Sequence, residues 1–198
     1  MIDDLEWMVS QWTGDGPARY GLVNGQPERL VRTLFTGMGS LSYGELAGER
    51  MKLGLLLHDP EEEHDCFADN THNSHYYDAL GIQNVYLGRY KRVDGSMVEG
   101  ASISDLVKSK AVSTDSALRD ALADTMKKMT VMVERAEQVE AYDQMIGEGN
   151  KEGNAVVQAA IDALLVQTKA IERAVAAVDL KPVSFEGSDS LDNPGAVE

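Results

Sequence analysis

The sequence is poor in cysteine and in basic residues. Cys66 is the only cysteine among 198 residues, so no disulfide bond can form within the chain. The 18 Lys and Arg residues are outnumbered by 33 Asp and Glu residues, which gives a formal net charge of −15. Nucleic acids and anionic membrane surfaces repel such an acidic protein, so we expect neither as a partner.

Targeting signals and membrane spans are also missing from the sequence as it stands. The first residues, MIDDLEWMVSQW, are acidic and amphipathic and contain neither the basic nor the apolar region of a secretory signal. No apolar stretch approaches the roughly 20 residues that a transmembrane helix needs. With 43% hydrophobic and 26% charged residues, the composition is that of a folded globular protein.

Apolar residues recur at helical spacing along most of the chain. They predict a helix over 28–35, a glycine-rich interruption over 36–40, and a second helix over 43–57. Three glycines weaken this second helix by about 1 kcal/mol each relative to alanine, so we interpret them as points of close helix packing. These glycines are Gly44, Gly48 and Gly54.

The next segment, 58–71, is polar and acidic and interrupts the helical pattern. A helix is predicted to restart at Asn70 or Thr71, and a polar connection over 91–101 precedes a short helix over 103–108. One side of the restarted helix is expected to face the core. That side carries Tyr76, Ala79, Leu80, Gln83, Tyr86 and Leu87.

Two long amphipathic helices follow, separated by the turn 147–150. A short polar turn between long helices predicts that they lie antiparallel. Their apolar stripes are Leu118, Leu122, Thr125, Met126, Met129, Met132 and Val133 in the first, and Val157, Ala160, Ile161, Leu164, Thr168, Ile171 and Val175 in the second. We therefore predict an all-α, four-helix-bundle-like fold in one domain over 1–198, with an N-terminal helix and loop over 1–26 and an irregular tail over 181–198.

All four histidines fall between residues 58 and 75, together with Cys66 and several acidic residues. Imidazole and carboxylate groups are ligands for iron, zinc, manganese and copper, so this segment is the first candidate site. Alternatives remain open for its members. His58 either caps a helix end or binds a ligand, His75 either shares a face with His72 or is exposed, and Cys66 is interpreted as a small buried residue.

A second candidate lies in the segment 44–51, GELAGERM. Glu45 and Glu49 are four residues apart and share a helix face beside Arg50. Two acids on one face repel each other unless a cation or an arginine lies between them, so a paired-carboxylate site and a salt-bridge network both remain possible. The His-Glu-x-x-His pattern of zinc proteases and phosphate-binding loops are absent.

Four segments resemble the C-terminal half of the imelysin family, which includes the iron-regulated protein A group and the insulin-cleaving metalloproteases. The similarity extends over nearly the whole chain. The segments are TGMGSLSYGELAGERM (36–51), EEEHDCFADNTH (61–72), ALGIQNVYLGRY (79–90) and FEGSDSLDNPGAV (185–197).

The resemblance implies an exported protein of bacterial iron or haem acquisition, located in the periplasm or at the cell surface. Members consist of two similar all-α halves, and a Gly-x-His-x-x-Glu motif of the N-terminal half faces the interface between them. That motif is absent here. The resemblance implies that this chain contributes cofactor-binding and metal-binding groups to the interface, with iron or zinc as the expected metal and haem as an open alternative. The cofactor-binding residues are Glu45, Glu49 and Arg50, and the metal ligands are His64, Asp69 and His72.

Three functions follow as hypotheses. The first is binding of a metal, haem or a partner through the acidic and histidine groups. The second is a metallopeptidase of the imelysin type, for which the sequence identifies no catalytic residue. The third is a non-catalytic homodimer in which a second copy replaces the missing half.

Overall fold

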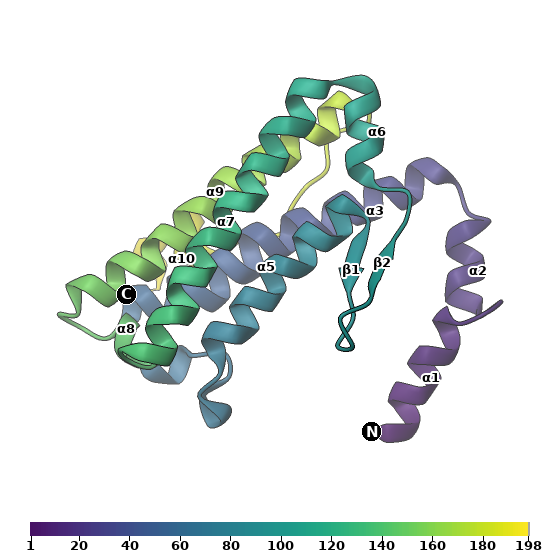
Figure 1. Ribbon diagram of the computed structural model, residues 1–198. Coiled ribbons are helices and arrows are strands. Elements are labelled where there is room, and N and C mark those ends of the chain that lie inside the picture. The colour runs from purple at the N-terminus through teal and green to yellow at the C-terminus, as the bar shows by residue number, and fades with distance from the viewer. Residues whose placement is uncertain (198) are drawn as a thin grey trace.

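The computed structural model describes residues 1–197, which fold almost entirely into helices (Figure 1). The long helices α7 (Val112–Gln138) and α9 (Lys151–Ala177) lie side by side and antiparallel, joined through the short helix α8 (Tyr142–Ile146). Helix α5 (Thr71–Leu87) and a continuous helical segment over 27–57 complete a bundle of four. The structure therefore confirms the all-α, four-helix-bundle-like fold and the antiparallel pair.

The segment 27–57 is one unbroken helical rod of three parts. Helix α3 (Pro27–Ser40) continues into a π-helix, η1 (Leu41–Lys52), and then into α4 (Leu53–Leu57). The predicted interruption over 36–40 is wrong, because the helix runs through these residues without a break. Gly39 there, and Gly44 and Gly48 in η1, let another part of the chain approach the helix surface closely.

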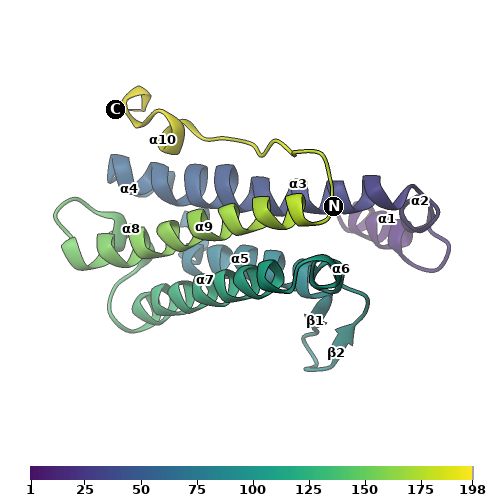
Figure 2. The same cartoon turned by 90° about the horizontal axis from the view of Figure 1, so that it is seen from above.

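That part is the C-terminal tail, which leaves α9 and runs back along the rod (Figure 2). A Cβ atom on Gly44 would lie 2.5 Å from the carbonyl oxygen of Glu186, and one on Gly48 would overlap Ser188. These two glycines therefore mark close packing against the tail and not against another helix. The third predicted packing glycine, Gly54, lies beside Ile146 of α8.

The tail contains two short helical elements, α10 (Asp189–Asp192) and the 3-10 helix η4 (Pro194–Ala196). Ser190 donates a hydrogen bond to the carbonyl oxygen of Gly48 at 3.0 Å, and Tyr43 donates to Asp192 at 2.5 Å. The bond to Asp192 and burial raise the pKa of Tyr43 to about 12. Glu198, the last residue of the predicted tail, lies outside the described residues.

The core is filled along the whole bundle by two apolar clusters. The cluster near α8 is rich in methionine and includes Met51, Met129 and Met132. The cluster at the other end surrounds Phe35 and Tyr86. Every member of the predicted α9 stripe is buried, and Met126 and Val133 are the two predicted α7 residues that are only half-buried.

Helix α5 faces the core with a side that only partly matches the predicted one. Ala79 and Tyr86 are buried as predicted, and Tyr76 and Leu87 pack half-buried against the core. Leu80 and Gln83 belong to neither core cluster, because the buried residues recur at alternating spacings of three and four. Two histidines continue the apolar stripe toward the start of the helix, which explains why a search for apolar residues alone misplaced the face. The stripe consists of His72, His75, Ala79, Ile82 and Tyr86.

Between α5 and α7 the chain forms a small antiparallel hairpin and a short helix. Strands β1 (Arg89–Lys91) and β2 (Met97–Glu99) pair with Tyr90 opposite Val98, where the sequence predicted only a polar connection. Helix α6 (Ile103–Lys110) then begins at a capping box formed by Ser102 and Asp105.

The N-terminal arm consists of α1 (Ile2–Trp12) and α2 (Pro17–Val23), and neither helix contains a buried residue. The arm extends away from the bundle, beyond the start of α3 (Figure 1). Across residues 1–197, no helix combines the length and the apolar character needed to cross a membrane.

Candidate functional site

The histidine-rich segment 58–70 forms a loop that is fastened to its surroundings at both ends. His58 ends α4 in a left-handed conformation (φ 53°), and its Nδ1 donates to the carbonyl oxygen of Ile146 at 2.6 Å. Asp65 donates its backbone N–H to Thr71 at 2.9 Å and accepts a hydrogen bond from Ser74 at 3.0 Å. His58 therefore ends helix α4 and ties the loop to α8. Of the two roles open from the sequence, this position fits a helix cap.

Three charged or polar side chains meet at the surface of this region, and a fourth, Asp78, lies near enough to feel their charge. We call the four the outer group. They are Glu45 and Arg50 of η1, His64 of the loop, and Asp78 of α5. Arg50 lies 3.2 Å from Glu45 Oε2 and donates to the His64 ring, with Nη1 2.6 Å from Nε2. Because an arginine only donates hydrogen bonds, this contact requires an unprotonated nitrogen on His64.

The π-helical geometry of η1 explains which residues pair. Its hydrogen bonds connect residues five apart, and Glu45 and Arg50 have this spacing. Glu49, at the α-helical spacing from Glu45, is exposed and takes no part in the ion pair. The Glu45 and Arg50 side chains are 45% and 26% exposed, so their pair contributes about 1 kcal/mol or less to stability.

Beneath the outer group lies a buried set that we call the inner group: Glu63, His72, His75 and Tyr142. The ring of His75 connects the two groups. Its centroid lies 6.4 Å from that of His64 in a stacked arrangement and 5.0 Å from that of Tyr142 in an edge-on arrangement. The site is thus a polar column that passes from the surface into the methionine-rich end of the core.

The inner group is rich in polar atoms that have no hydrogen-bond partner. Within the described residues, seven buried side-chain nitrogen and oxygen atoms lack a partner, and five of them belong to this group. Buried polar atoms are nearly always hydrogen-bonded, so such a concentration is costly and is typical of a functional site. The five atoms are Glu63 Oε2, His72 Nδ1, His75 Nδ1, His75 Nε2 and Tyr142 Oη.

Burial shifts the pKa values of this group toward the neutral forms. Burial lowers the pKa of His75 to about 3, and the positive charge of Arg50 acts in the same direction. Burial and the charge of Asp143 raise the pKa of Glu63, and burial also raises that of Tyr142. In the outer group, burial raises the pKa of Asp78, while the positive charge of Arg50 opposes that shift.

The predicted site residues are divided by the structure. Glu45, Arg50 and His64 come together in the outer group, and His72 belongs to the inner group. Glu49 and Asp69 are exposed and lie outside both groups. The interpretation of Cys66 as a buried residue is wrong: it lies exposed at the tip of the loop beside the fully exposed Phe67.

Side chains of the types that bind metals are present in this region, but they do not lie close to one another. Within residues 1–197, no three His, Cys, Asp or Glu side chains lie close enough together to hold a metal ion. His64 is occupied by Arg50, and Asp69 occupies an exposed left-handed turn (φ 48°). Their role as metal ligands stays a prediction.

Asp78 and Tyr142 lie outside both predicted candidate segments. Glu63 and His75 lie within the histidine-rich segment but were not chosen as ligands. A signal for one of these four residues was present in the sequence, because His75 continues the three-and-four spacing of Ala79 and Ile82 toward the start of α5. The other three depend on long-range packing between α5, α8 and the loop, which local spacing does not encode.

The fold and the site define a helical-bundle protein with a histidine, arginine and carboxylate site at one end of the bundle. Comparison with known families agrees with this class and refines it. The imelysin family model matches residues 1–171, and the chain belongs to the imelysin family. No curated protein matches the chain.

Proposed function

We propose that this chain is a binding module of an imelysin-type protein of bacterial iron or haem acquisition, acting in the periplasm or at the cell surface. The observation that carries the proposal is the inner group, in which five buried polar atoms lack a partner. Unpaired imidazole and carboxylate atoms next to an accessible arginine–histidine pair favour a polar ligand that would satisfy them.

Iron or zinc fits the chemistry of these donors. Neutral imidazole is the form that binds a metal, and burial keeps His75 neutral at physiological pH. Because no three ligand-type side chains meet in the structure, metal binding requires the loop 58–70 to move. In this proposal His64 exchanges Arg50 for the metal, and His72 and Asp69 join it.

Calorimetric titration with ferrous and zinc ions tests the proposal. We expect saturable binding by the unaltered chain and at least about tenfold weaker binding by the double variant His64→Ala, His72→Ala. The double variant Glu61→Ala, Glu62→Ala is the matched control, because it removes two exposed side chains of the same loop that lie outside the site. Absence of saturable binding, or equal binding by the double variant, would overturn the proposal.

Peptide hydrolysis is a second candidate, and Glu63 is the residue that favours it. Its buried carboxylate has a raised pKa and one unpaired oxygen, as a general base beside a metal-bound water requires. Cleavage of a peptide that stops on addition of a chelator and in Glu63→Gln would support this function. If the chain is inactive in the presence of added zinc, binding remains the only proposed function.

A further inference from the structure

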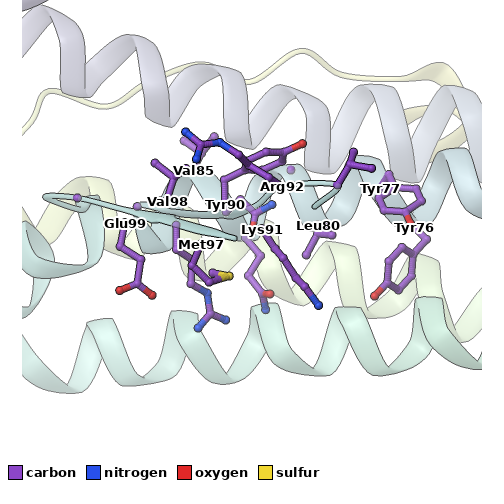
Figure 3. Close-up of a pocket in the computed structure, with 17 residues that line it drawn as sticks. Tyr76, Tyr77, Leu80, Val85, Tyr90, Lys91, Arg92, Met97, Val98 and Glu99 are labelled. Carbon is purple, nitrogen blue, oxygen red and sulfur yellow. The ribbon is translucent and has the colours of Figure 1, made fainter. Parts of the chain in front are cut away.

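A large apolar groove lies on the far side of α5 from the core, between this helix and the hairpin (Figure 3). Its volume is about 1320 Å³. Tyr76 and Tyr77 lie at one end and the hairpin residues Met97 and Val98 at the other. Tyr77 is 64% exposed and Met97 is 50% exposed, so a substantial apolar surface faces solvent.

The groove is basic although the protein as a whole is strongly acidic. Arg89, Lys91 and Arg92 line it, and Glu99 is its single acidic residue. None of these three cations forms a salt bridge within residues 1–197. In a chain with a net charge of −15, such a concentration of unpaired positive charge favours an acidic occupant.

Helix α1 has the properties that such an occupant needs. One face is apolar and exposed, and Trp12 at its end remains 51% exposed. Helical spacing places Asp4 and Glu6 at the two edges of this apolar face, where they can meet the cations of the groove. Asp3 and Trp7 lie on the opposite side, and the helix contains no basic side chain. The apolar face consists of Ile2, Leu5, Met8, Val9 and Trp12.

We propose that α1 of a second copy of this chain docks into the groove, and that the exchange is reciprocal. Within one chain, α1 packs against α2, and the arm leads away from the bundle, so both complementary surfaces stay uncovered (Figure 1). Two copies related by a two-fold axis cover both grooves and both α1 helices, and the assembly closes as a dimer. An amphipathic helix seated in an apolar groove is a common mode of protein recognition.

The charges allow a decisive test by sedimentation equilibrium in the presence of a chelator, which separates this proposal from metal binding. The unaltered chain is expected to form a dimer that weakens at high salt. One variant reverses the helix charges, with Asp3→Lys, Asp4→Lys and Glu6→Lys. A second reverses the groove charges, with Arg89→Glu, Lys91→Glu and Arg92→Glu. Each variant alone should associate at least about tenfold more weakly, because like charges then meet at both contacts.

Mixing the two variants should restore a dimer, since each reversed helix then meets a reversed groove and each native helix meets a native groove. Asp120→Lys, Asp124→Lys and Glu137→Lys on the exposed face of α7 is the control with the same change of charge, and it should dimerise like the unaltered chain. The proposal is overturned by a monomeric unaltered chain, including one whose α1 docks into its own groove. A mixture of the two variants that stays monomeric also overturns it.

Discussion

His75 occupies the protein interior as a neutral imidazole with neither ring nitrogen hydrogen-bonded. A phenylalanine of similar shape keeps the edge-on contact with Tyr142 and removes both unpaired atoms. We therefore expect His75→Phe to raise the free energy of unfolding by about 1–2 kcal/mol. Urea denaturation near neutral pH measures this change, with Tyr142→Phe as the parallel removal of one unpaired hydroxyl. A destabilised His75→Phe variant would show that an unseen partner satisfies the imidazole.

The lowered pKa of His75 also predicts how stability depends on pH. The unfolded chain binds a proton at this residue below about pH 6.5, whereas the folded chain does so only near pH 3. The free energy of unfolding is therefore unaffected by this residue above about pH 6.5 and decreases as the pH falls toward 3, by at most about 1.4 kcal/mol per pH unit. The raised pKa of Glu63 acts in the opposite direction, since the folded state then holds its proton more tightly.

Urea denaturation of the unaltered chain and of His75→Phe between about pH 6.5 and pH 3 separates the contribution of His75 from that of Glu63. The variant should lose less stability on acidification, and the difference between the two curves should grow steadily below about pH 6.5. Parallel curves would mean that His75 is protonated in the folded state.

A second buried residue, Asp115, forms hydrogen bonds at the other end of the bundle, and their contribution to stability can be measured. Its carboxylate accepts hydrogen bonds from Tyr86 at 2.9 Å and from Ser104 at 2.6 Å. Asp115→Ala leaves both hydroxyl groups without this acceptor, and we expect a loss of about 2–4 kcal/mol in the free energy of unfolding. Asp120→Ala, at an exposed position on the same helix, should change it by no more than about 0.5 kcal/mol.

At the scale of elements, the tail packs closely against η1. Gly44→Ala places a methyl group against the backbone of Glu186. Although alanine favours helix formation, we expect a loss of about 1–3 kcal/mol and faster proteolysis of the tail. Gly37→Ala in α3 meets no neighbouring atom, so it should instead stabilise the protein by about 0.5–1 kcal/mol. Equal effects of the two substitutions would contradict the close approach of the tail.

The same contact shows which elements could be predicted from sequence. The stripes of α7 and α9 are long and regular, so their periodicity identified both the helices and the buried faces. Gly39, Gly44 and Gly48 were misinterpreted because their partner, the tail, lies some 140 residues further along the chain. The hairpin was missed because β1 and β2 are three residues long and exposed on both faces, which leaves no alternation to detect.

The site was predictable to a similar degree. Short-range spacing placed Glu45 and Glu49 on one helix face beside Arg50 and left a paired-carboxylate site and a salt-bridge network both open. It also placed His64 and His72 in one histidine cluster. The π-helical register of η1, which selects Glu45 over Glu49, and the burial of His75 beneath the loop depend on tertiary packing. Local sequence patterns carry no direct signal for either feature.

For the molecule as a whole, the absence of buried residues in α1 and α2 predicts that the bundle is independent of the arm. Removal of residues 1–26 should change the free energy of unfolding of the monomer by no more than about 0.5 kcal/mol. Urea denaturation of dilute protein measures this value, and the dependence on urea should stay nearly unchanged because little surface is buried there. A large loss of stability would mean that the arm packs against the bundle.

The position of Cys66 makes the loop directly observable. Because this thiol is the only one in the chain and faces solvent, a maleimide dye attaches to the protein at one known point, without any engineered cysteine. The dye lies two residues from His64 and away from the core. Its fluorescence therefore reports in real time whether the loop rearranges when a metal ion is added.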